Sequence, residues 1–316
     1  MNSFIHKADD LVTSHEQTRA GFIETALEKN RKAQPYIEAA RTLKSMASDV
    51  GTPINLLGRE DIMPSLLTAS GLSDKALQYF TEADKIFAVR QLIEQFLDPA
   101  GKYWVDELVY RFLLIRGASL DGSIRNHIGT MAKIKVIRKV LSVLQTMGIS
   151  YSVLTKDNKT RNRWDGLKYT DDFENAENIC AISWQYGDID KILFFDSKIP
   201  IVNKNIDICL YKGGTATYDA GRIVNKPEKA IMFGELKGGI DPAGADEHWK
   251  TANTALERIR MAFKNNIKTS FVGAAIERNM ADEIWAQLST RILNNAANLT
   301  IETQFTDYCK WIVTLE

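Results

Sequence analysis

The sequence predicts two domains, an all-α N-terminal domain over residues 1–140 and an α/β domain with a mixed sheet over residues 141–316. Two observations support this division. Apolar residues recur at helical spacing through the first half, whereas the second half combines short β-branched and aromatic runs with helical segments. The length of 316 residues, with 45% apolar and 25% charged residues, is ordinary for folded domains of this size.

The first 147 residues carry helical patterns separated by Gly and Pro. In segment 18–48, Phe22, Ile23 and Leu27 repeat at helical spacing, and Pro35 is expected to interrupt the run. Further helices are expected over 65–69, 73–87, 88–97, 104–115 and 131–147. The N-terminal domain is therefore predicted to be mainly helical.

From Tyr151 onward the hydrophobic period changes. Strands are expected over 151–154, 191–196, 206–211, 230–237 and 270–276, and helices over 245–264 and 280–294. Because strands and helices alternate in the last part, a mixed sheet with helices on both faces is predicted.

Composition excludes several classes of protein. The longest uncharged stretch, 140–155, has 16 residues and contains Ser, Gln, Thr and Gly, whereas a membrane span needs about 20 mostly apolar residues. The N-terminus lacks an apolar signal-peptide core, so a cytoplasmic location is expected. Cys180, Cys209 and Cys309 lack CxxC spacing and are expected to be buried free thiols rather than a disulfide frame or a zinc site.

The formal net charge of zero conceals a basic belt, residues 111–163, which holds eleven Lys and Arg but two acids. Such a belt suits a polyanion, while a solvated face or pairing with acids elsewhere explains it equally. Within the belt, Lys133, Lys135, Arg161 and Arg163 are candidate contacts to DNA phosphates. The polar segment 156–164 could follow the DNA backbone, and a flexible surface loop is the alternative.

Three ionisable residues stand in otherwise apolar strands. Asp207 lies within 206–211, and Glu235 and Lys237, two apart near the end of 230–237, project on the same face. Burying such charges is costly unless they are paired or bind a metal. The set suits phosphodiester hydrolysis, with carboxylates as Mg²⁺ ligands and the ammonium stabilising charge on the phosphate. A buried ion network without catalysis is the alternative.

These residues carry a family resemblance. Ile206-Asp207 with Glu235-Leu236-Lys237 resembles the PD-(D/E)xK nuclease motif, with Ile where Pro often stands. The run 234–250, GELKGGIDPAGADEHWK, resembles the AvaI/BsoBI group of type II restriction endonucleases, as do the length and the order of the two halves.

The resemblance implies a restriction-endonuclease-like (PD-(D/E)xK) α/β domain and a homodimer that encloses duplex DNA. It further implies Mg²⁺-dependent cleavage of the degenerate palindrome C^YCGRG with four-nucleotide 5′ overhangs. A cognate DNA methyltransferase is the implied functional partner. A nuclease that recognises DNA structure or damage, and a DNA-binding regulator without cleavage, are the alternatives; the complete acidic and basic set argues against the second.

The resemblance also implies roles for single residues. Asp207, Glu235 and Lys237 would be the catalytic set, His248 would lie beside the attacking water, and Asp241 would lie near the bases. From the residues alone, the alternative for His248 is a surface histidine, and the alternative for Asp241 is an aspartate that caps a turn.

Three other cations are candidate DNA contacts. Arg31 and Lys75 are weak candidates for base contacts, aligned only loosely with the group, and helix-surface pairing explains Arg31 equally. Lys204, just before the strand that carries Asp207, is the third.

Overall fold

The computed structural model describes residues 2–159, 163–166, 169–216, 223–264 and 266–316. The chain forms two compact units, a sheet unit of Met1–Phe22 with His127–Glu316 and a helical unit of Ile23–Asn126. The division therefore differs from the boundary expected at residue 140. None of the described helices is long and apolar enough to cross a membrane.

Helices α1 (His15–Ser48) and α4 (Trp104–Thr146) each contribute residues to both units. Pro35 lies inside α1, so the expected interruption is wrong; the residue is exposed, and the helix continues past it although a proline leaves one backbone carbonyl without its helical partner. The separate helices expected over 104–115 and 131–147 are one helix, α4, because the glycines between them, although poor helix formers, do not break it.

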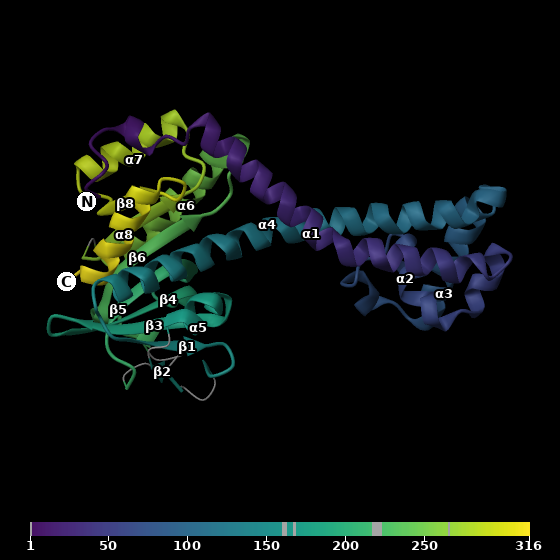
Figure 1. Cartoon of the computed structure of the whole chain (residues 1–316), viewed down its shortest axis with the longest axis horizontal. Coiled ribbons are helices and arrows are strands. Elements are labelled where there is room, and N and C mark those ends of the chain that lie inside the picture. The colour runs from purple at the N-terminus through teal and green to yellow at the C-terminus, as the bar shows by residue number, and fades with distance from the viewer. Residues whose placement is uncertain (1, 160–162, 167–168, 217–222, 265) are drawn as a thin grey trace. The chain divides into compact units, whose positions relative to one another are not determined.

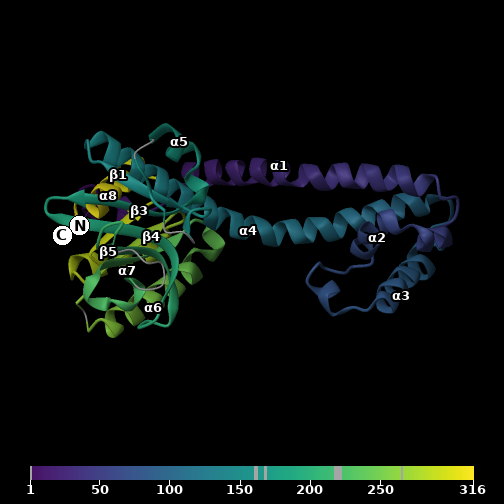
Figure 2. The same ribbon diagram turned by 90° about the horizontal axis from the view of Figure 1, so that it is seen from below.

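Within the helical unit, α1 and α4 run antiparallel and side by side (Figures 1 and 2). Two ion pairs fix their direction, Lys29–Asp121 at 2.6 Å and Lys44–Asp106 at 2.8 Å. The shorter helices α2 (Met63–Ala69) and α3 (Glu82–Leu92) complete this unit around a core that includes Trp104. The prediction of a helical N-terminal region is confirmed.

The sheet unit contains an eight-stranded mixed sheet in the order β2-β1-β3-β4-β5-β6-β7-β8. The strands are β1 (Tyr151–Thr155), β2 (Asp165–Gly166), β3 (Ile179–Tyr186), β4 (Ile189–Ile199), β5 (Lys204–Lys212), β6 (Ala230–Lys237), β7 (Lys268–Gly273) and β8 (Asn295–Asn298). Neighbours are antiparallel as far as β6, and β6, β7 and β8 are parallel. The mixed sheet is confirmed, although β2, β3 and β8 were not predicted.

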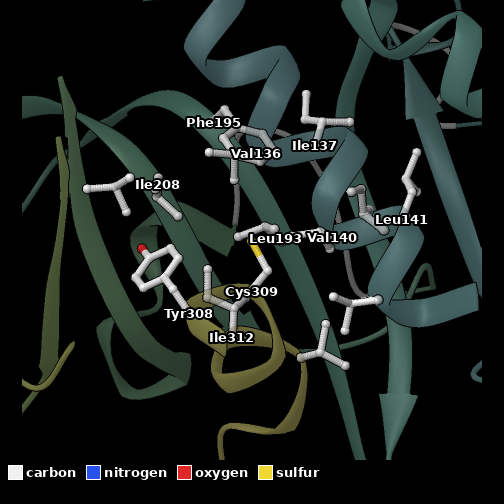
Figure 3. Packing of buried hydrophobic residues seen from close by; sticks show 14 of the residues in the cluster. Val136, Ile137, Val140, Leu141, Leu193, Phe195, Ile208, Tyr308, Cys309 and Ile312 are labelled. Carbon is white, nitrogen blue, oxygen red and sulfur yellow. The ribbon is translucent and has the colours of Figure 1, made fainter. Parts of the chain in front are cut away.

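Two hydrophobic layers cover the sheet. On one face, α6 (Ala245–Ala262) and α7 (Arg278–Ser289) pack on one core cluster; on the other, α8 (Glu302–Thr314) and the last part of α4 pack on a second. Figure 1 shows the helices on the sheet, and Figure 3 shows α4 and α8 meeting over β4 and β5. Helices on both faces were expected; the short α5 (Tyr169–Glu174) and α8 were not.

The N-terminal segment belongs to the sheet unit because its polar groups bond to β8 and its surroundings. The side chain of Asn2 donates to the carbonyls of Ala296 (3.1 Å) and Gln304 (2.7 Å). In return, Asn298 Nδ2 donates to the carbonyl of Leu11 at 2.9 Å. Such contacts join residues nearly 300 positions apart, so hydrophobic periodicity within one segment cannot predict them.

The cysteines are free, as expected. Cys209 and Cys309 are buried and Cys180 is half-buried. Trp184 is also buried, and its Nε1 donates to the carbonyl of Val313 at 3.0 Å.

Candidate active site

The antiparallel register of β5 and β6 brings the three predicted residues together. Ile208 pairs with Gly234, so Asp207 and Glu235 occupy the next opposed position. Lys237 Nζ lies 3.3 Å from Asp207 Oδ2 and 2.9 Å from Glu235 Oε2. The backbone N–H of Leu236 donates to Asp207 Oδ2 at 2.8 Å. One ammonium thus bridges two carboxylates where the paired part of β5 and β6 ends.

The two acids differ in exposure. The Asp207 side chain is 28% exposed, whereas that of Glu235 is 6% exposed. Burial, and then the negative charge of Asp207, raise the pKa of Glu235 to about 7, although Lys237 opposes this shift. Burial disfavours the Lys237 ammonium, but Asp207 and Glu235 together outweigh it and raise the pKa of Lys237 above its usual value.

This cluster fits a divalent cation. Two carboxylates crowded together repel each other, and a hard cation relieves that repulsion while accepting their oxygens as ligands. Within the described ranges, no group of three or more His, Cys, Asp or Glu side chains is arranged to hold a metal ion. Asp207 and Glu235 could hold a cation that takes one or two carboxylates from the protein and completes its shell with water and phosphate oxygens, as Mg²⁺ usually does.

Two glycines allow the close packing beneath and beside the cluster. A Cβ on Gly234 would lie 2.5 Å from Ser270 Oγ, and one on Gly238 would lie 2.5 Å from the Cβ of Ala132. Gly238, directly after Lys237, therefore lets α4 approach the end of β6. Gly234 has no role in the sequence-based prediction, although a glycine inside an apolar strand signals such a close approach.

His248 lies in the first turn of α6, as the sequence predicts for the start of this helix. Its side chain is exposed. Its Nε2 would be 3.8 Å from a Cβ on Gly239 and 3.3 Å from one on Gly244. The imidazole therefore lies over the loop that follows Lys237, with a free path to solvent.

Asp241 caps the short 3₁₀ turn Pro242–Gly244, and its Oδ1 accepts from the N–H of Ala243 at 3.0 Å. This is the capping alternative that the sequence left open. The side chain is exposed, so its second oxygen remains accessible. Lys204 is the first residue of β5, is partly exposed, and precedes Asp207 by three residues.

The candidate contacts in the helical unit lie on its surface. Arg31 forms a two-pronged ion pair with Glu28, at 2.8 and 2.7 Å. This is the helix-surface pairing that the sequence left open. Lys75 is exposed at the start of the 3₁₀ turn Ala76–Tyr79.

The candidates of the basic belt have mixed surroundings. Lys133 pairs with Asp196 at 2.5 Å, and Lys135 donates to the carbonyl of Leu299 at 3.0 Å. These contacts tie α4 to β4 and to the segment after β8, and they are the pairing within the chain that the sequence left open. Arg163 is exposed, and Arg161 lies outside the described residues.

Comparison with known proteins covers the whole chain. The family model "Restriction endonuclease BsobI" matches residues 1–315. The type II restriction enzyme BsoBI of Geobacillus stearothermophilus is 47% identical over 314 residues, which cover 98% of this chain and 97% of that protein. The type II restriction enzyme AvaI of Nostoc sp. is 48% identical over 315 residues, 98% of each chain. The similarity spans both compact units and all the site residues described above.

Proposed function

The chain belongs to the BsobI restriction endonuclease family and is a type II restriction endonuclease, and on that premise we propose how it cleaves. It hydrolyses phosphodiester bonds of duplex DNA with Mg²⁺ at the degenerate palindrome C^YCGRG, leaving 5′ overhangs. The observation that carries the catalytic assignment is the cluster of Asp207 on β5 with Glu235 and Lys237 at the end of β6.

Each residue of the cluster has a distinct role in this proposal. Asp207 and Glu235 would hold Mg²⁺, which when bound would polarise the phosphate and lower the pKa of a water molecule. Lys237 stabilises the negative charge that develops on the phosphate, because its ammonium is fixed between the two acids before substrate arrives. His248 accepts a proton from the attacking water or holds its orientation.

DNA recognition is assigned to residues around this cluster and on the helical unit. Asp241, exposed in the loop after β6, accepts from a cytosine amino group. Lys204, Arg31 and Lys75 contact the duplex, and Lys133, Lys135, Arg161 and Arg163 contact phosphates.

The protein acts as a homodimer in this proposal. A palindrome has two-fold symmetry, and a two-fold protein reads both half-sites with the same residues. Since each chain supplies one Asp207–Glu235–Lys237 cluster, two copies provide one cluster for each DNA strand. A cognate DNA methyltransferase protects the same sequence in the host.

A plasmid digest with Mg²⁺ tests the function. Discrete fragments whose ends map to C^YCGRG are expected, whereas a smear or nicking that depends on DNA structure would contradict sequence-specific cleavage. Asp207→Ala should abolish cleavage and retain duplex binding in Ca²⁺, because it removes a metal ligand. Unchanged cleavage by this variant would remove Asp207 from the active site.

A further inference from the structure

The residue opposite Asp207 on the other neighbouring strand has an unusual backbone. Phe195 pairs with Ile208 and Ser197 pairs with Ile206, so Asp196 of β4 and Asp207 of β5 occupy the opposed position between these pairs. Asp196 has a φ of 50°. This left-handed conformation is sterically disfavoured for residues with a Cβ, although Asp tolerates it better than most. The distortion of β4 therefore falls at the position of the catalytic acid.

Both strands change face at this position. Leu193 and Phe195 of β4 pack toward α4 and α8 (Figure 3), yet Ile199, which regular alternation would place beside them, packs in the α6 and α7 cluster. In β5, Ile208 packs toward α4 and α8, whereas Ile206 packs in the opposite cluster. A local distortion next to an active site commonly redirects a side chain in this way.

The side chain of Asp196 is held on the α4 face. Regular alternation would place it with Phe194, in the α6 and α7 cluster, but its carboxylate pairs with Lys133 of α4 at 2.5 Å. The preceding residue, Ala132, lies where Gly238 lacks a side chain. Helix α4 therefore contacts the sheet on both sides of β5. It contacts β4 through Asp196, and it packs beside the end of β6 at Gly238.

We propose that Asp196 is a positioning residue for Asp207: its left-handed backbone opens the β4–β5 ladder and directs the Asp207 carboxylate toward β6. There Asp207 Oδ2 accepts from Leu236 N at 2.8 Å and lies 3.3 Å from Lys237 Nζ. This inference rests on the proposed function, because Asp196 matters for cleavage only through Asp207.

Two replacements separate the backbone of Asp196 from its charge. Asn also tolerates the left-handed region, so Asp196→Asn keeps the backbone and removes the charge. A β-branched residue is strongly disfavoured there, so Asp196→Val returns the strand to extended geometry. Because small misplacements of reacting groups cost up to about a hundredfold in rate, Asp196→Val should lower the single-turnover cleavage rate by about ten- to a hundredfold, and Asp196→Asn by much less.

Arg291→Val is the matched control. Arg291 also has a positive φ, 60°, but precedes the amino end of β8, whereas Lys237 lies at the carboxyl end of the parallel β6. Its valine variant should lose thermal stability and keep the wild-type cleavage rate. Calorimetry of Ca²⁺ binding without DNA supplies a second readout, which should weaken in Asp196→Val and not in Arg291→Val. If Asp196→Val does not fold, Asp196→Ala imposes a milder form of the same strain.

The outcomes distinguish this inference from the proposed function. A folded Asp196→Val or Asp196→Ala protein that cleaves at the wild-type rate overturns the positioning role. An equal loss in Asp196→Asn and Asp196→Val also overturns it, because the charge and not the backbone would then matter. If Asp207→Ala itself cleaves DNA normally, the proposed active site fails instead.

Discussion

Replacing Glu235 by Gln should inactivate the enzyme and, at alkaline pH without divalent cations, stabilise its fold. In the folded protein the pKa of Glu235 is raised from 4.5 to about 7, first by burial and then by Asp207. A carboxyl group with a raised folded pKa contributes stability that is complete below its unfolded pKa and is lost as the pH rises through the folded pKa. The window for this loss is therefore about pH 4.5 to 7.

The size of the effect follows from the shift. About 2.5 pKa units at about 1.4 kcal/mol each give about 3 kcal/mol that ionised Glu235 costs the fold above pH 7. Gln removes that charge and keeps an oxygen that accepts from Lys237. The attraction of Lys237 for the ionised carboxylate already opposes the shift, so this figure includes the charged partner that Lys237 loses. A net stabilisation of about 1–3 kcal/mol is expected at pH 8.5 and almost none at pH 4.5.

Urea unfolding in EDTA, followed by tryptophan fluorescence at both pH values, measures the difference. Glu257→Gln, an exposed carboxylate on α6, is the matched control and should change stability by less than about 0.5 kcal/mol. Adding Ca²⁺ should stabilise the wild type more than the Glu235→Gln variant, because the metal binds the folded state through this carboxylate. A Glu235→Gln protein less stable than wild type at pH 8.5 would refute the reasoning, since Lys237 would then outweigh burial.

Three further predictions concern Lys237, His248 and Gly238. Lys237→Met should lower single-turnover cleavage by about two to three orders of magnitude, since one such donor contributes roughly 3–4 kcal/mol; a loss under about tenfold would mean that Lys237 is structural. His248→Ala should lose at least about a hundredfold in cleavage rate while binding in Ca²⁺ changes far less, and Lys250→Ala, an exposed residue on the same helix, should cleave normally. Near-wild-type cleavage by His248→Ala would exclude its assigned role. Gly238→Val should destabilise the fold by about 1–3 kcal/mol in thermal denaturation, because its side chain would overlap Ala132; an unchanged Tm would mean that α4 yields easily.

Local sequence patterns determined much of this protein. Asp207, Glu235 and Lys237 stand out because charge in an apolar strand is costly, and the two-residue spacing of the last two places them on one face. Helical spacing likewise predicted α6 to within two residues of its ends, and α7 to within five. These features are local, so the sequence of a single segment is enough to predict them.

Other elements escaped prediction because distant residues stabilise them. Strand β8 reads Asn-Ala-Ala-Asn, without β-branched or aromatic residues, and is buried because its polar groups bond within the fold, as Asn298 does to Leu11 and Thr13. Residues 116–130 of α4 contain three glycines and nevertheless continue the helix. The N-terminal 22 residues join the sheet unit for the same reason.

The site itself divides in the same way. The residue types and their spacing on one strand were set by the sequence, but only the pairing of β5 with β6 decided that Asp207 would lie beside Lys237. Likewise, the left-handed backbone of Asp196 is visible only in the folded chain, where β5 fixes its register and Lys133 holds its carboxylate. Distances between strands depend on hydrogen bonds and packing among residues far apart in sequence, and no periodicity along a single segment encodes them.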